Sequence, residues 1–145
     1  ELIALAGVPH IGQPAEPVVQ VGDTVGKGQI IAHAVDYVSA TVHAPTSGRI
    51  VEIGPVRDVL HAPRHPYTRG LMGTIPKLDH DTETLVQIDG SMPRLAAMPQ
   101  GCRFHPRCPE AMPICQQESP VFKETTPGHY VHCWLFQQHP EGIKE

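Results

Sequence analysis

Four cysteines in a proline-rich tail constrain this chain more than any other feature. Three of them lie in the stretch "GCRFHPRCPEAMPIC", residues 101–115, and the fourth follows after a further seventeen residues. They are Cys102, Cys108, Cys115 and Cys133. Proline interrupts helices and central strands. A tail this rich in proline cannot build a large core of its own, so we expect an additional cross-link to hold it folded.

Several kinds of site fit four thiols. Structural zinc usually takes cysteine pairs separated by two residues, and the absence of such a pair disfavours zinc without excluding it. Two disulfides, in any of three pairings, require an oxidising compartment. Free core thiols are the simplest alternative. A 4Fe–4S cluster fits the wide spacing best, because it is larger than one ion and takes its ligands from wider loops.

The composition favours a mainly β fold with a small helical content. The 145 residues include 16 Pro and 13 Gly, with only 5% aromatic residues, so we expect short strands and much irregular structure. A net charge of -4 argues against a nucleic-acid partner. No apolar run approaches the ~20 residues of a transmembrane segment. The stretch "LIALAGV" at residues 2–8 is too short for a signal peptide and lacks a basic flank, so we interpret the chain as a fragment.

Residues 14–53 are typical of β-structure. Short β-branched runs alternate with Gly-Asp, Gly-Lys-Gly and Pro-Thr-Ser-Gly turns. The stretch "VGDTVGKGQII", residues 21–31, resembles the barrel-sandwich hybrid fold of biotinyl and lipoyl domains. Residues 10–48 further resemble the N-terminal region of the C subunit of the Rnf-type ion-translocating ferredoxin:NAD oxidoreductase. The hairpin tip "HAVDYVSA" has no lysine, so covalent attachment of biotin or lipoate is not expected.

The second half has a different pattern. Pro66 predicts the start of one short helix that runs to about Ile75, and Leu85 to Ile88 predicts a short strand closed by an Asp-Gly turn. From about Arg49 to Phe136, the chain resembles the C-terminal extension of oligopeptide and dipeptide ABC transporter ATP-binding subunits. The stretches "RHPYTRGLMGTIP" and "GCRFHPRCPEAMPIC" carry this resemblance. It implies that the four cysteines hold a 4Fe–4S cluster, with zinc as the alternative occupant.

The two resemblances meet in the stretch "GRIVEIGP", residues 48–55, which fits both families. We therefore predict a barrel-sandwich hybrid-like β-domain over residues 1–54 and a transporter-type domain with the four-cysteine site over residues 55–145. A recombined or engineered chimera is favoured over a natural gene fusion. The chain contains no Gly-x-x-x-x-Gly-Lys-Ser/Thr loop and no ABC signature, so we expect neither ATP binding nor enzymatic activity.

The expected function is a structural staple. A cluster with four protein ligands leaves no open position for a substrate, and it would tie together a tail that lacks its own core. Nearby cations should offset the negative charge of the thiolates. The candidates are Arg103, His105, Arg107 and His132. The alternatives are a scaffold whose thiols bind zinc, pair or stay free, a redox sensor, and an interaction module of a membrane-associated redox or peptide-transport complex. Both resemblances imply a location at the cytoplasmic membrane face.

The β-half lacks the second hairpin that completes a barrel-sandwich domain, because the resemblance ends after Ile53. Some strand edges should therefore be open, which proteins usually avoid. We expect the strand at 85–88 to cover one edge, or the protein to form a homodimer through the edges. Surface or turn positions are expected for five histidines, and Asp36 and Glu52 are interpreted as solvated hairpin residues. The five histidines are His10, His43, His61, His65 and His80.

Overall fold

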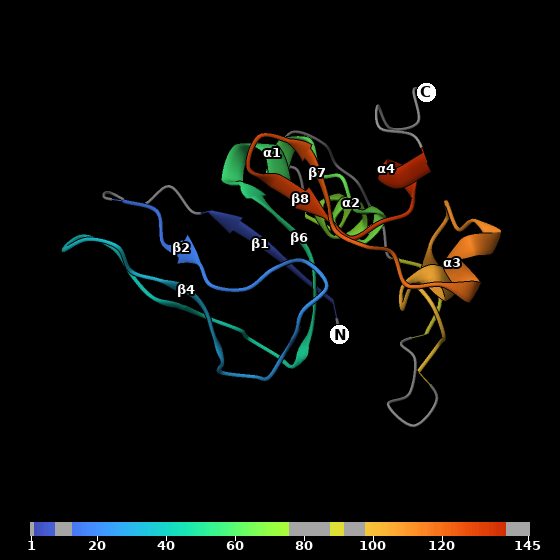
Figure 1. The fold of residues 1–145 in the computed structure, drawn as a ribbon, viewed down its shortest axis with the longest axis horizontal. Helices are drawn as coiled ribbons and strands as arrows, with labels where there is room; N and C mark the ends of the chain where they lie inside the picture. Colours follow the sequence, from blue (N-terminus) through green and yellow to red (C-terminus); the bar gives the residue numbers. More distant parts are fainter. Residues whose placement is uncertain (1, 8–12, 76–87, 92–97, 139–145) are drawn as a thin grey trace.

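The computed structural model describes residues 2–7, 13–75, 88–91 and 98–138. The chain is mainly β-structure with a few short helices, as predicted (Figure 1). Among the described strands, neither of the two sheets closes into a barrel. The elements are β1 (Leu2–Gly7), β2 (Glu16–Pro17), β3 (Thr24–Val25), β4 (Ile30–His33), β5 (Val42–His43), β6 (Gly48–Pro55), α1 (Val56–His61), α2 (Pro66–Gly73), the 3-10 helix η2 (His105–Arg107), α3 (Pro113–Gln117), β7 (Lys123–Thr126), β8 (His129–Val131) and α4 (Leu135–Gln138).

Strand β6 lies at the centre of the larger sheet. It pairs in parallel with β1 and antiparallel with both β3 and β8, and β7 extends the sheet beyond β8. Five consecutive residues of β6, from Ile50 to Gly54, are buried. A strand that is covered on both faces does not alternate between buried and exposed positions. The stretch that fits both resemblances is therefore the structural centre of the molecule.

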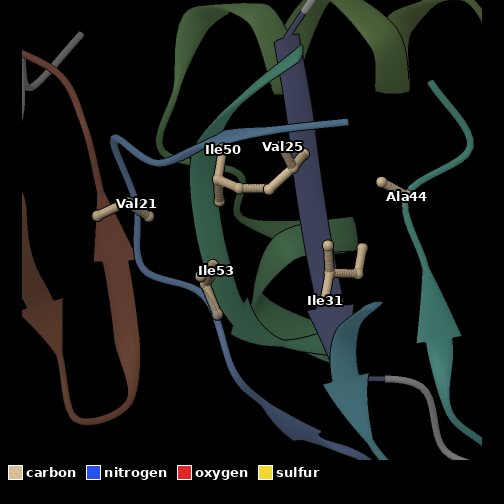
Figure 2. Packing of buried hydrophobic residues seen from close by; sticks show 6 residues of the cluster. All are labelled: Val21, Val25, Ile31, Ala44, Ile50 and Ile53. Carbon is tan, nitrogen blue, oxygen red and sulfur yellow. The ribbon is translucent and has the colours of Figure 1, made fainter. Parts of the chain in front are cut away.

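The smaller sheet consists of β2, β4 and β5, all antiparallel. The turns predicted in this half are present, and Gly22 and Gly28 adopt positive φ angles of 96° and 81° that favour glycine. Side chains from β3, β4, β6 and the loops beside them form the core of this half (Figure 2). The core residues are Val21, Val25, Ile31, Ala44, Ile50 and Ile53.

The predicted helix at Pro66 is confirmed as α2, which ends at Gly73 rather than Ile75. Its N-cap is His65, whose Nδ1 accepts the backbone N–H of Tyr67 at 3.0 Å. Pro66 occupies the first turn, where a missing N–H leaves no helical hydrogen bond unmade. The described residues also contain α1, α3 and α4, which the sequence analysis did not predict.

The sequence analysis predicted that a strand at 85–88 would cover one edge of the β-half, but other strands flank β6. Residues 85–87 of the predicted strand lie outside the described residues, and Ile88 belongs to no strand. Instead, β1 and the hairpin of β7 and β8 flank β6, and the hairpin turns at Gly128 with a positive φ of 75°. The division into domains 1–54 and 55–145 stays a prediction, because the larger sheet contains strands from both halves.

Candidate metal centre

The four cysteines come from three segments of the tail. Cys102 follows the positive-φ residue Gly101, Cys108 follows η2, Cys115 lies in α3 and Cys133 comes two residues after β8. The backbone N–H of Cys102 donates to the carbonyl of Cys115 at 2.9 Å, so two of these segments are joined directly. The local turns are therefore fixed by backbone hydrogen bonds before any cofactor is considered.

All four cysteines line one common cavity, together with the side chains of Phe104, Trp134 and Leu135. The cavity has a volume of about 10 Å³, which is about the space of one water molecule. Cys115 and Cys133 are buried, whereas Cys102 and Cys108 are partly exposed, and all four thiols are free. The folding of the tail thus brings together every site residue that the sequence analysis named.

Burial sets the protonation of these thiols. It raises the pKa of Cys108 to about 11 and the pKa of Cys133 to about 12, and the neighbouring cysteines act in the same direction. Burial also raises the pKa of Cys102 above its usual value. These three side chains are therefore neutral thiols near pH 7 when no cation is bound. A bound metal would have to displace their protons, which makes binding dependent on pH.

The described residues contain no group of three or more His, Cys, Asp or Glu side chains with the arrangement that holds a metal ion. A single zinc ion needs four sulfurs at ~2.3 Å from the metal. The cysteine side chains in their present positions do not form such a site. A cluster is wider than one ion, but it exceeds the space of one water molecule, so its insertion requires the thiols to move apart. The occupant of the site stays a prediction.

Side-chain hydrogen bonds and a proline stabilise the backbone around the cavity. Trp134 donates its indole N–H to the carbonyl of Glu118 at 3.0 Å, which joins the segment after Cys133 to the segment after α3. Gln137 in α4 donates to the carbonyl of Val121 at 2.5 Å. Pro113 lies in the first turn of α3. These contacts fix the backbone on both sides of the thiols.

A second and larger cavity, with a volume of about 430 Å³, adjoins the first at Cys108. An ion pair between Arg69 of α2 and Glu110 lies at its wall, with a separation of 2.9 Å. Cys108 and Glu110 line both cavities. Small molecules in solvent therefore have a path to the edge of the cysteine site.

The predicted neighbouring cations occupy different positions. His105 lines the cysteine cavity, and its Nδ1 lies 2.9 Å from the carbonyl oxygen of Cys102. Arg107 instead donates to the carbonyls of Ile88 and Asp89, at 3.4 and 3.3 Å. The prediction that Arg107 serves the site is therefore not supported by its hydrogen bonds.

Arg49 is a cation near the site that the sequence analysis missed. It belongs to β6, and its Nη1 donates to the hydroxyl of Ser119 at 3.2 Å, four residues after Cys115. It also interacts electrostatically with Cys102 and Arg103. No local signal links positions 49 and 102, because the contact depends on how the sheet and the tail pack.

A buried polar cluster lies beside the cysteine site. Glu52 is fully buried, and its carboxylate accepts the backbone N–H groups of Arg64 at 2.7 Å and His65 at 3.1 Å. His129 Nε2 lies 2.7 Å from the same carboxylate. Burial alone would raise the pKa of Glu52, but these hydrogen bonds hold the pKa below its usual value. Both Glu52 and His129 have no exposed side-chain surface, so this cluster is closed to substrates.

Two predictions about polar residues were wrong for this reason. Glu52 was expected in a solvated hairpin, and His65 at a surface or turn position, but both are buried. Glu52 is buried because β6 is covered on both faces, whereas His65 is the N-cap of α2 and its N–H donates to Glu52. Asp36, His43 and His61 are exposed, as expected. The other two histidines of that prediction, His10 and His80, lie outside the described residues.

The comparisons with known proteins match the chain in two parts. The family model described as the RnfC barrel sandwich hybrid domain matches residues 3–66. The model described as the oligopeptide/dipeptide transporter, C-terminal region, matches residues 51–115. The two matches overlap over residues 51–66, which include most of β6 and all of α1. The chain is thus a composite of two parts, each similar to a different family.

Curated transport ATP-binding proteins match more than half of the chain. The chain is 39% identical to the dipeptide transport ATP-binding protein DppD of Bacillus subtilis (strain 168), over 77% of this chain and 32% of the relative. It is 46% identical to the oligopeptide transport ATP-binding protein OppD of Escherichia coli (strain K12), over 61% of this chain and 26% of the relative. The chain therefore spans about a third or less of these relatives. None of the helices in its described part has the length and apolar character of a membrane span.

Proposed function

We propose that this chain is a non-enzymatic composite whose C-terminal tail binds a 4Fe–4S cluster through Cys102, Cys108, Cys115 and Cys133. The observation that carries this proposal is the convergence of four free thiols from three segments on one cavity. Thiolates are the usual ligands of such clusters. When bound, the cluster supplies covalent cross-links between the segments and so acts as a staple.

The chain's own residues prepare the tail for this staple. Backbone hydrogen bonds already join Cys102 to the segment of Cys115, and Trp134 joins the segment of Cys133 to Glu118. The cluster would then add its stabilisation where the tail has few core residues. The tail's apolar cluster consists of Val131, Cys133, Leu135 and Phe136, with Met112 packed against it. One cysteine of the site, Cys133, thus lies in the core that a cluster would reinforce.

The test is to purify the protein under anaerobic conditions, or to reconstitute it with iron and sulfide. We expect about four iron and four sulfide per chain, together with visible thiolate-to-iron absorption. Replacing Cys115 by Ser should abolish the absorption. A colourless protein with one zinc per chain supports the zinc alternative, and a colourless protein without metal supports the scaffold alternative. Either result overturns the proposal.

A redox-sensing role is separated from a staple by the response to oxidants. A staple should change stability when it is lost but should not cycle at a potential close to that of the cell. Cys108 borders the larger cavity, so an oxidant has access to one edge of the site. Reversible loss and recovery of the visible absorption near a cytosolic potential would favour the sensor.

A second candidate is an interaction module of a peptide-transport complex at the cytoplasmic membrane face. The relatives reported above are dipeptide and oligopeptide transport ATP-binding proteins. The hairpin between β4 and β5 exposes Val35 and Val38, and Tyr37 is fully exposed. Apolar side chains gathered on a surface are typical of contact regions.

Among the described strands, β2 and β5 each have one partner, so a homodimer through these edges is the simplest such contact. Sedimentation over a range of concentrations should detect it, and a monomer at every concentration excludes it.

A further inference from the structure

Cys102 and Cys115 lie against each other where two turns of the tail meet. The backbone N–H of Cys102 donates to the carbonyl of Cys115 at 2.9 Å. Of the backbone hydrogen bonds between described residues of turns and loops, this is the one that joins two of the four cysteines. Residues bonded in this way have Cα atoms about 5.5 Å apart, and disulfides span Cα separations of about 4.4–6.8 Å. The backbone is therefore placed for a bond between these two sulfurs.

The local conformation holds the two segments at this separation. Gly101 has a φ of +67°, and a Cβ there would lie 2.5 Å from the carbonyl oxygen of Cys115. Glycine is thus required where the segments approach each other. The N–H of Cys115 donates to the carbonyl of Met112 at 2.9 Å, and the carbonyl of Cys102 accepts the N–H of His105 at 3.0 Å. Each cysteine therefore belongs to a hydrogen-bonded turn that fixes its backbone.

The cavity that the four cysteines share suits a direct bond between two of them. Cys102 and Cys115 both line this cavity, which has a volume of about 10 Å³. It holds about one water molecule, so a bulky group does not fit between the sulfurs. A disulfide adds no atoms to the site and removes two hydrogen atoms. The small volume that opposes a large occupant therefore does not oppose this bond.

We propose that Cys102 and Cys115 form a reversible disulfide with a small-molecule disulfide as the oxidant, and that this bond locks the loop of residues 102–115. The thiolate of Cys102 attacks one sulfur of the oxidant, which breaks the oxidant's S–S bond, forms a mixed disulfide and releases one thiol. The thiolate of Cys115 then attacks the sulfur of Cys102 and releases the second thiol. The two protons and two electrons that the cysteines lose end on the two released thiols.

Exposure sets the order of these two steps. Cys102 is partly exposed, whereas Cys115 is buried with 7% of its surface exposed. A dissolved oxidant therefore reaches Cys102 first, and Cys115 completes the bond from inside. The locked loop contains η2 and Cys108. This disulfide requires neither iron nor zinc, so it is independent of the proposed function.

The experiment treats the reduced, metal-free full chain with oxidised glutathione. A mildly alkaline buffer is used, because burial raises the pKa of Cys102 and the thiolate is the attacking species. Free thiols, counted after denaturation, should fall from four to two, and dithiothreitol should restore them. Trypsin digestion without reduction should link the peptide of Cys102 to the peptide that contains Cys108 and Cys115, and fragmentation of the linked peptides should place the bond at Cys115. A bond at Cys108, or four remaining thiols, overturns the proposal.

Two double variants compare the possible partners of Cys102. Cys108→Ser with Cys133→Ser keeps the proposed pair, whereas Cys115→Ser with Cys133→Ser leaves Cys108 as the partner. The first variant should close at least about tenfold faster, because the fold holds its two cysteines in position. In urea this preference should disappear, since the shorter loop between 102 and 108 then closes at least as readily. Equal rates for the two variants without urea contradict the proposed pair.

The outcomes also separate this disulfide from the proposed function. If the metal-free chain forms the disulfide between Cys102 and Cys115 but never binds iron, the proposed function fails and the disulfide stands. If the chain binds a cluster while the oxidised metal-free chain pairs other cysteines, only the disulfide assignment fails.

Discussion

His129 Nε2 lies 2.7 Å from Oε1 of Glu52, and neither side chain has any exposed surface. Glu52 belongs to β6 and His129 to β8, 77 residues later in the sequence. The same carboxylate accepts the N–H groups of Arg64 and His65 immediately before α2. One buried acid thus joins the sheet, the start of the helix and the tail hairpin. The hairpin of β7 and β8, which follows the cysteine-rich loops, is therefore bonded to the central strand β6 by a buried side chain.

Replacing Glu52 tests this junction. Glu52→Ala leaves three buried donors without their acceptor, and loss of one partner from a buried pair typically costs about 3–5 kcal/mol of unfolding free energy. Urea denaturation of the variant and the parent chain measures the difference. Glu16→Ala removes an exposed glutamate of β2 and should change stability by less than about 0.5 kcal/mol. A loss below about 1 kcal/mol for Glu52→Ala contradicts the junction.

The buried histidine before α2 makes stability depend on pH. Burial lowers the pKa of His65 to about 3 from an ordinary value of 6.5, while Glu52 opposes this shift and His132 and Arg69 add to it. The unfolded chain therefore binds this proton more readily than the folded chain. The contribution of His65 is complete above pH 6.5 and is lost as the pH falls toward 3. The pKa of Glu52 is also lowered, so its contribution is lost below an ordinary value of 4.5.

We expect the free energy of unfolding to fall by about 1.4 kcal/mol per pH unit between these limits for His65 alone. Urea denaturation at a series of pH values measures the slope. His65→Asn is the matched variant, because asparagine keeps an acceptor at the N-cap but does not titrate. In this variant, the dependence of the unfolding free energy on pH should be smaller by the contribution of about one proton. An unchanged slope would assign the acid sensitivity to another group.

The sequence was informative where the signal was local. The Gly-Asp and Gly-Lys-Gly turns were predicted, and in the structure their residues Gly22 and Gly28 adopt positive φ angles. Pro66 predicted the first turn of α2. The four cysteine side chains line one cavity, and their role as a cofactor site stays a prediction. The glycine turns and the start of α2 depend on the conformational limits of a few neighbouring residues, which single residue types report reliably.

The missed features depend on pairing between distant segments. In a half-buried strand, buried and exposed side chains alternate, and this pattern predicts that Glu52 faces solvent. Strand β6, however, has neighbours on both edges and is covered on both faces. Its partner His129 lies in a hairpin whose Pro-Gly turn was present in the sequence but was not interpreted. Arg49 has no neighbour in sequence that hints at Ser119. Such contacts follow from the packing of the sheet and not from local propensity.

Removal of the proposed cluster should weaken the fold. Oxidation followed by chelation takes away four cross-links in the tail, so the melting temperature should fall by several degrees, at roughly 2–8 °C per kcal/mol for domains of this size. Differential scanning calorimetry before and after treatment measures the change. A variant with Ser at all four cysteine positions should start from the lower value and show no further change. Equal melting temperatures for the loaded and stripped parent chain would argue against a staple.

The backbone at Gly101 offers the sharpest test of the cysteine framework. Its φ is +67°, and a Cβ at this position would lie 2.5 Å from the carbonyl oxygen of Cys115, which accepts the N–H of Cys102. Gly101→Ala therefore combines backbone strain with a clash between the two segments that carry these thiols. Gly128→Ala is the matched control, because its φ is +75° and nothing lies within 4 Å of the added Cβ.

Both variants should lose about 1–2 kcal/mol from the positive φ alone. Only Gly101→Ala should also lose most of its bound iron, because it forces apart the carbonyl and the N–H that set the spacing of two ligands. Iron per chain and urea denaturation, measured on the same preparations, separate the two effects. If Gly101→Ala binds as much iron as Gly128→Ala, the hydrogen bond between Cys102 and Cys115 does not define the site, and the cluster would have to be held by a different arrangement of the tail.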